Sequence, residues 1–95
     1  MSQPDNAAPA PAPAHAESPL SKRRSAWLTE HFFDSYVRWR EACVEVQLTY
    51  QRWDRAERQD RGLAFAAYCA ALDREGQAAS VHADSADAVR EFAGD

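Results

Sequence analysis

The fold is decided by residues 26–58, which read AWLTEHFFDSYVRWREACVEVQLTYQRWDRAER. Large apolar residues recur in this stretch at alternating spacings of four and three positions: Phe32, Tyr36, Trp39, Cys43, Val46, Tyr50 and Trp53. That spacing places all of them on one side of an α-helix. Because no proline or glycine interrupts the run, it predicts one long amphipathic helix over about 26–58, with Ser25 as its N-cap.

A second row with the same spacing follows. Its large members come first: Phe65, Cys69 and Leu72. Later members are small, and Gly76 weakens a helix by about 1 kcal/mol relative to alanine. We therefore expect a second helix from about 62 to 75–82. A short C-terminal helix carrying Val89 and Phe92 is expected after it.

The two rows predict an all-α fold, an antiparallel helical hairpin with coiled-coil packing. The turn residues Asp60 and Gly62 place the reversal of the chain near residue 60. Residue k of the first helix then lies opposite about residue 120 − k of the second. In this register Trp53 contacts Phe65 and Tyr68. The hairpin domain is expected to occupy residues 25–95.

Residues 1–24 have a different composition from the rest of the chain. All five prolines lie in the first 20 residues, largely alternating with alanine. Such a segment offers few side chains to bury and disfavours helix, so we expect a disordered tail. Lys22, Arg23 and Arg24 end it. They support one alternative function, a small regulatory adaptor whose basic arm contacts nucleic acid. The net charge of −4 argues against that alternative, because nucleic-acid-binding modules usually present a net basic face.

Composition also argues against several other classes. The chain has no run of 18 apolar residues, so we expect no membrane span. With only three glycines, a phosphate-binding loop is not expected, and neither a cofactor nor a small-molecule substrate is indicated. Cys43 and Cys69 are 26 positions apart, which is not a metal-binding spacing. We expect free thiols and a cytoplasmic protein.

Catalytic chemistry finds little support in the sequence. His31 and Asp34 lie three positions apart on the first predicted helix and suggest, as a further alternative, a metal-dependent helical-bundle enzyme. Di-metal bundles use a Glu-x-x-His pattern, which does not occur in this sequence. We therefore expect no catalytic residues, no metal site and no enzymatic activity.

The first helix carries a second apolar row beside its seam, which we name the docking stripe: Phe33, Val37, Val44 and Leu48. Together the two rows span about 200° of the helix, more than one partner helix can cover. The C-terminal segment, a second copy or a different protein must cover the remainder. The leading hypothesis is a non-enzymatic protein–protein interaction or assembly module. We expect a homodimeric four-helix bundle ahead of an unknown partner helix or an isolated three-helix monomer.

Overall fold

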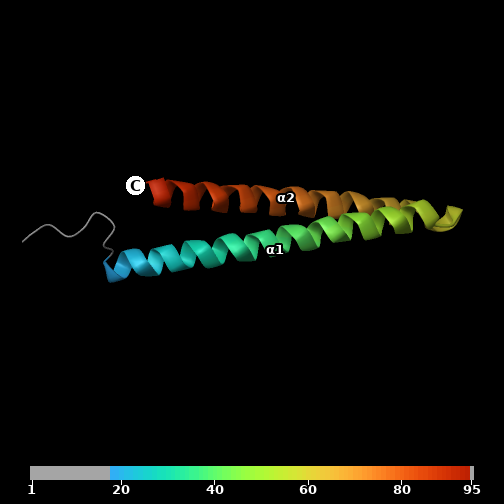
Figure 1. Ribbon diagram of the computed structural model, residues 1–95. Coiled ribbons are helices and arrows are strands. Elements are labelled where there is room, and N and C mark those ends of the chain that lie inside the picture. The colour runs from blue at the N-terminus through green and yellow to red at the C-terminus, as the bar shows by residue number, and fades with distance from the viewer. Residues whose placement is uncertain (1–17, 95) are drawn as a thin grey trace, which may run out of the picture.

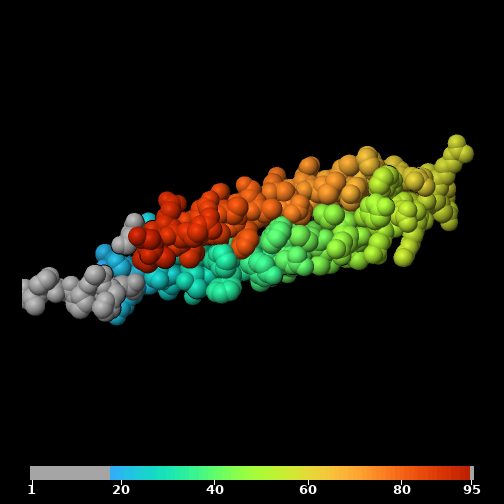
Figure 2. Space-filling view, turned by 45° about the horizontal axis from the view of Figure 1, so that its top comes forward, coloured from blue at the N-terminus to red at the C-terminus, as the bar shows by residue number. Residues whose placement is uncertain are grey.

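The computed structural model describes residues 18–94, which form two helices joined by a short connection. Helix α1 spans Pro19–Arg55, η1 is a 3-10 turn at Arg58–Asp60, and α2 spans Arg61–Gly94. The two helices run antiparallel, and the end of α2 lies near the beginning of α1 (Figure 1). They touch along their length and form a rod (Figure 2). The predicted all-α hairpin is confirmed.

Helix α1 begins before the predicted start at residue 26. Ser18 is its N-cap, and the Ser21 backbone N–H donates to the Ser18 hydroxyl over 3.1 Å. Pro19 occupies the first turn, where its missing N–H has no helical partner to lose. Ser25, the predicted cap, therefore lies inside the helix. The predicted tail lies outside the described residues as far as residue 17.

The chain reverses through extended residues. Helix α1 ends at Arg55, before the predicted end at residue 58, because Ala56 and Glu57 adopt extended backbone angles with ψ of 139° and 159°. Gly62, which was predicted to mark the reversal, lies in the first turn of α2. No non-glycine or glycine residue between 18 and 94 has a positive φ. The reversal therefore needs no left-handed residue.

Helix α2 is continuous through Gly76 and reaches Gly94. In this detail the structure differs from the prediction, which ended the helix at 75–82 and began a separate C-terminal helix. One glycine lowers helix stability by only about 1 kcal/mol. Contacts with α1 continue on both sides of it, since Trp39 donates to Glu75 and stacks on His82. These contacts offset the destabilisation of α2 by Gly76.

The register at the turn end agrees with the prediction. The ring of Trp53 lies 4.9 Å from that of Phe65 and 5.5 Å from that of Tyr68. Towards the open end of the hairpin, the hydroxyl oxygens of Ser35 and Ser85 are 3.0 Å apart. The two helices therefore pack in one continuous register over most of their length.

Candidate functional site

Small side chains form the centre of the contact between the helices. Ser35 and Thr49 on α1, and Ala71 and Ser85 on α2, are all between 1% and 3% exposed. They belong to rows in which every seventh residue is small: 35, 42, 49 and 56 on α1 and 64, 71, 78 and 85 on α2. Small residues allow two helices to approach closely. This repeat is visible in the sequence, but the search for large apolar residues missed it.

The ten residues predicted to form the hairpin seam divide into two groups. Six are half-buried: Phe32, Trp39, Cys43, Val46, Trp53 and Cys69, of which the two cysteines are free thiols. The other four, Tyr36, Tyr50, Phe65 and Leu72, are 40–48% exposed. On α1 the predicted row of Phe32, Trp39, Val46 and Trp53 lies in the seam, whereas the row of Tyr36, Cys43 and Tyr50 is replaced there by the positions one residue earlier.

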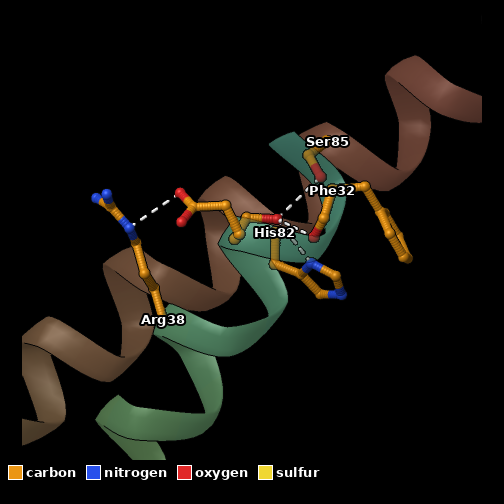
Figure 3. Close-up of polar contacts among 6 residues, drawn as sticks. Phe32, Arg38, His82 and Ser85 are labelled. Carbon is orange, nitrogen blue, oxygen red and sulfur yellow. Dashed lines mark hydrogen bonds and ion pairs between the residues drawn. The ribbon is translucent and has the colours of Figure 1, made fainter. Parts of the chain in front are cut away.

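Ser35 is the hub of a polar contact within the seam. Its hydroxyl donates to the Phe32 carbonyl oxygen over 2.8 Å and lies 3.0 Å from both the His82 Nδ1 atom and the Ser85 hydroxyl. A hydroxyl has one hydrogen and can accept as well, so Ser35 donates in one of these contacts and can accept in the others. His82 and Ser85 both reach from α2 towards the turn of α1 at Phe32, whereas Arg38 points away (Figure 3).

Other polar side chains in the seam are also hydrogen-bonded. Thr49 donates its hydroxyl hydrogen to the backbone of its own helix, at 2.8 Å from the Glu45 carbonyl oxygen. The indole N–H of Trp39 donates to Glu75 over 2.8 Å. Paired polar groups in a helix seam favour the one register that satisfies them. The contact between Trp39 and Glu75, which joins the two helices, therefore helps to specify how α1 and α2 align.

Aromatic rings line one edge of the seam. At the open end the imidazole of His82 lies 5.0 Å from the Phe32 ring and 5.7 Å from the Trp39 ring. At the turn end the Tyr68 ring lies 5.6 Å from Tyr50 and 5.5 Å from Trp53. We name the exposed or half-exposed surface of this edge the aromatic side: Tyr36, Cys43 and Tyr50 on α1, with Phe65 and Leu72 on α2.

These five residues share an edge for a geometric reason. Each follows a member of the small rows by one position. Two antiparallel helices are related by a twofold rotation about an axis normal to their common plane, so equivalent positions lie on the same side of that plane. The contacts of Tyr50 and Phe65 across the seam, to Tyr68 and Trp53, agree with this placement.

The opposite edge of the seam has different chemistry. One groove there is lined in part by Arg38 and Arg74, together with the small residues Ala42 and Ala78. A second groove near the turn includes Arg52. We name this surface the arginine side: Arg38, Arg52 and Arg74. The hairpin therefore has one edge rich in rings and another that carries arginines together with acidic residues such as Asp34 and Asp60.

The docking stripe is exposed on α1. Phe33 is 60% exposed, Val37 52%, Val44 51% and Leu48 40%. Counted at about 100° per residue, the four side chains lie on the side of α1 turned away from the seam. Val89 and Phe92, the candidates for covering the stripe within one chain, belong to α2 and are half-buried along its seam face.

The residues of the two alternative functions are dispersed or engaged separately. His31 stacks on Trp27 at 5.0 Å, while Asp34 forms an ion pair with Arg38 at 3.0 Å. Across residues 18–94, no three His, Cys, Asp or Glu side chains gather as a metal ion would require. The basic residues 22–24 are exposed in the first turns of α1, and successive positions point about 100° apart.

The hydropathy of the two helices bears on whether either could span a membrane. Neither α1 nor α2 contains a stretch that is both apolar and long enough to cross a bilayer.

Comparisons with known proteins add no family or relative. No protein-family model matches the chain, and no curated protein or solved structure is significantly similar to it. A role for the chain must therefore be inferred from the surfaces of the hairpin itself.

Proposed function

We propose that this chain is a non-enzymatic protein–protein interaction or assembly module, in which the docking stripe of α1 is buried against an amphipathic helix of another chain. One observation carries the proposal. Four large apolar side chains on one side of α1 are each 40–60% exposed, and that side faces away from α2. Exposed apolar side chains gathered on one side of a helix are the surface that a helix presents to a partner groove or helix.

The energy available is sufficient to matter. Complete burial of a valine, leucine or phenylalanine side chain contributes about 1.5–3 kcal/mol. Since roughly half of each docking-stripe side chain remains exposed, covering all four adds about 3–6 kcal/mol before the cost of association. A micromolar dissociation constant corresponds to about 8 kcal/mol. The stripe therefore supplies a large part of the free energy of a specific contact.

Photo-cross-linking from the stripe tests this proposal. Val37 is replaced with p-benzoylphenylalanine, and cells expressing the protein are irradiated. We expect a discrete adduct, whose mass spectrum identifies either another protein or a second copy. Val44→Asp in the same chain should abolish the adduct, because a partner helix would have to bury an unpaired carboxylate. Circular dichroism should show unchanged helix content, since the Val44 side chain is 51% exposed in the hairpin.

The matched control is on the other helix. Ser80 is exposed on α2, on the side away from α1, so Ser80→Asp adds the same charge outside the stripe. That variant should retain the adduct. An adduct that survives both Val44→Asp and Leu48→Asp would show that the stripe is not the contact surface, as would equal cross-linking from position 80.

A further inference from the structure

The aromatic side has a pattern of large and small residues that is complementary to itself. On α2, the positions one after the small row are Phe65, Leu72, Ala79 and Ala86. The two large residues lie on the turn side of a midpoint between positions 75 and 76, and the two small ones lie on the other side. If a second copy is rotated by 180° about an axis that passes through this midpoint perpendicular to the rod, each large residue of one α2 lies over a small residue of the other α2.

The matching positions of α1 have a centre of their own. They are Tyr36, Cys43 and Tyr50, so the pattern on α1 is symmetric about Cys43. A rotation about Cys43 brings this residue onto itself and exchanges the two tyrosines. The symmetric pattern on α1 and the large-to-small pattern on α2 arise from different parts of the sequence.

The fold brings these two centres to the same level of the rod. Trp39 donates to Glu75 and stacks on His82, which places it between those two residues of α2. Tyr50 lies against Tyr68. Interpolation between these contacts puts Cys43 level with residues 75 and 76 of α2. One twofold axis, perpendicular to the rod, can therefore pass through both centres.

We propose that a second copy of this chain docks on the aromatic side about this axis, giving an antiparallel four-helix bundle with the two turns at opposite ends. Each α1 lies over the α1 of the other copy, and each α2 over the other α2. Phe65 meets Ala86 of the second copy and Leu72 meets its Ala79. On α2 this pairing of large with small residues lets the two layers interdigitate at the density of a protein interior. On α1, Tyr36 meets Tyr50 of the second copy on each side of the small Cys43.

The opposite orientation, with both turns at one end, fits less well. It would place α1 over α2 of the second copy. Tyr50 would then meet Phe65 in both pairs of helices, so the contacts between large side chains would all lie at the turn end. In the proposed orientation the Tyr36–Tyr50 contacts lie on both sides of the axis. At the open end the alanines of α2 would face only Tyr36. The two hairpins would be wedged apart at one end, which leaves voids at the other.

The area of contact is adequate for a stable dimer. About the proposed axis the two copies overlap from one turn to the other, roughly 40 Å at 1.5 Å per residue. Two helices side by side are about 20 Å wide, given an interaxial distance of 8–10 Å. Each copy would therefore cover about 800 Å², the value typical of a specific protein–protein interface.

Charge also favours the aromatic side over the arginine side. The five residues that define the aromatic side are uncharged, whereas the arginine side carries Arg38, Arg52 and Arg74 beside the acidic Asp34 and Asp60. Two copies meeting there would have to remove these charged groups from water, which is costly. Glu75 lies near the proposed axis, bonded to the Trp39 indole. The Arg40 guanidinium lies 5.8 Å from the centre of the same ring.

Oxidative cross-linking tests the position of the axis. The two Cys43 residues face each other across it, within the ~7 Å between Cα atoms that a disulfide allows. The two Cys69 residues would be about 20 Å apart along the rod. With copper phenanthroline, Cys69→Ser should give a disulfide-linked dimer and Cys43→Ser should not. Equal cross-linking of the two variants, or none in the Cys69→Ser variant, overturns the proposed axis.

A distance between the turns tests the orientation independently. Gln59→Cys, in a background with Cys43→Ser and Cys69→Ser, carries a spin label at the turn. We expect a label-to-label distance of about 45 Å for turns at opposite ends. A distance below about 25 Å would mean that both turns lie together. A monomeric mass in light scattering at 100 µM protein would exclude a second copy altogether.

Disruption of the interface separates this inference from the proposed function. Leu72→Asp, on the aromatic side, should convert the dimer to monomer, while Ser80→Asp should leave it intact. The docking stripe remains outside this interface, so the adduct formed from position 37 should survive Leu72→Asp. If Val44→Asp dissociates the dimer and Leu72→Asp does not, the second copy binds the docking stripe. The inference then fails and the proposed function stands.

Discussion

Replacing Ser35 with alanine is the sharpest test of the polar seam. The change removes the hydroxyl that donates to the Phe32 carbonyl and lies within hydrogen-bond distance of His82 and Ser85. Ser35 and Ser85 are 3% and 2% exposed, so water cannot easily replace the lost partner. His82 is half-buried and can turn towards solvent. The main penalty therefore falls on the Ser85 hydroxyl.

The magnitude follows from these contacts. Loss of the hydrogen bonds and of the partner of a buried hydroxyl should lower the free energy of unfolding by about 2 kcal/mol. Alanine favours helix over serine by about 0.5 kcal/mol, which opposes this loss. Ser80→Ala measures that gain directly, because Ser80 is exposed in the interior of α2. We therefore expect Ser35→Ala to be about 2 kcal/mol less stable than Ser80→Ala.

A double-mutant cycle isolates the bond between the two serines. Ser85→Ala alone should lower the free energy of unfolding by about 1 kcal/mol. The double variant should lose about 1 kcal/mol less than the sum of the single losses, since neither serine is left without the other. Urea unfolding followed by circular dichroism measures each value at one fixed protein concentration, because association adds to apparent stability. Additivity within about 0.3 kcal/mol, or equal stability of Ser35→Ala and Ser80→Ala, would refute the reasoning.

Three further changes test the packing and the ends of the helices. Trp53→Ala removes a half-buried ring that packs on two rings of α2, so the free energy of unfolding in urea should fall by about 3 kcal/mol. In the control Trp27→Ala, at a 60% exposed position, it should fall by less than about 1 kcal/mol. Equal losses in the two variants would contradict the packing. Gly76→Ala should raise the free energy of unfolding by about 1 kcal/mol, because an added Cβ meets no atom within 4 Å; a lower melting temperature would count against a continuous α2. Ser18→Ala removes the N-cap of α1 and should destabilise the first turn by about 1 kcal/mol. Amide hydrogen exchange should therefore become faster in the first turn of α1 only. Unchanged exchange in that turn would argue against the cap.

Much of the fold could be predicted because its signals are local. The spacing of large apolar residues along 32–53 indicates a helix without reference to any other part of the chain. The capping signal at Ser18 and Pro19 is also present in the sequence, although the expected helix began later. Ala56 and Glu57 carry no such signal, since residues of these types are common within helices. Their extended backbone follows from the need to bring α2 back along α1.

The sequence by itself determined two long helices, their antiparallel pairing and a register correct at Trp53. Only the tertiary structure decided which row of α1 faces α2. Tyr36 and Ser35 are neighbours in the sequence and point about 100° apart, and the rule that large apolar residues are buried favours Tyr36. Ser35 is buried instead because small side chains permit close helix packing and because Ser85 and His82 supply its hydrogen bonds. Both reasons depend on the partner helix, so the aromatic side appears only once α1 and α2 are paired.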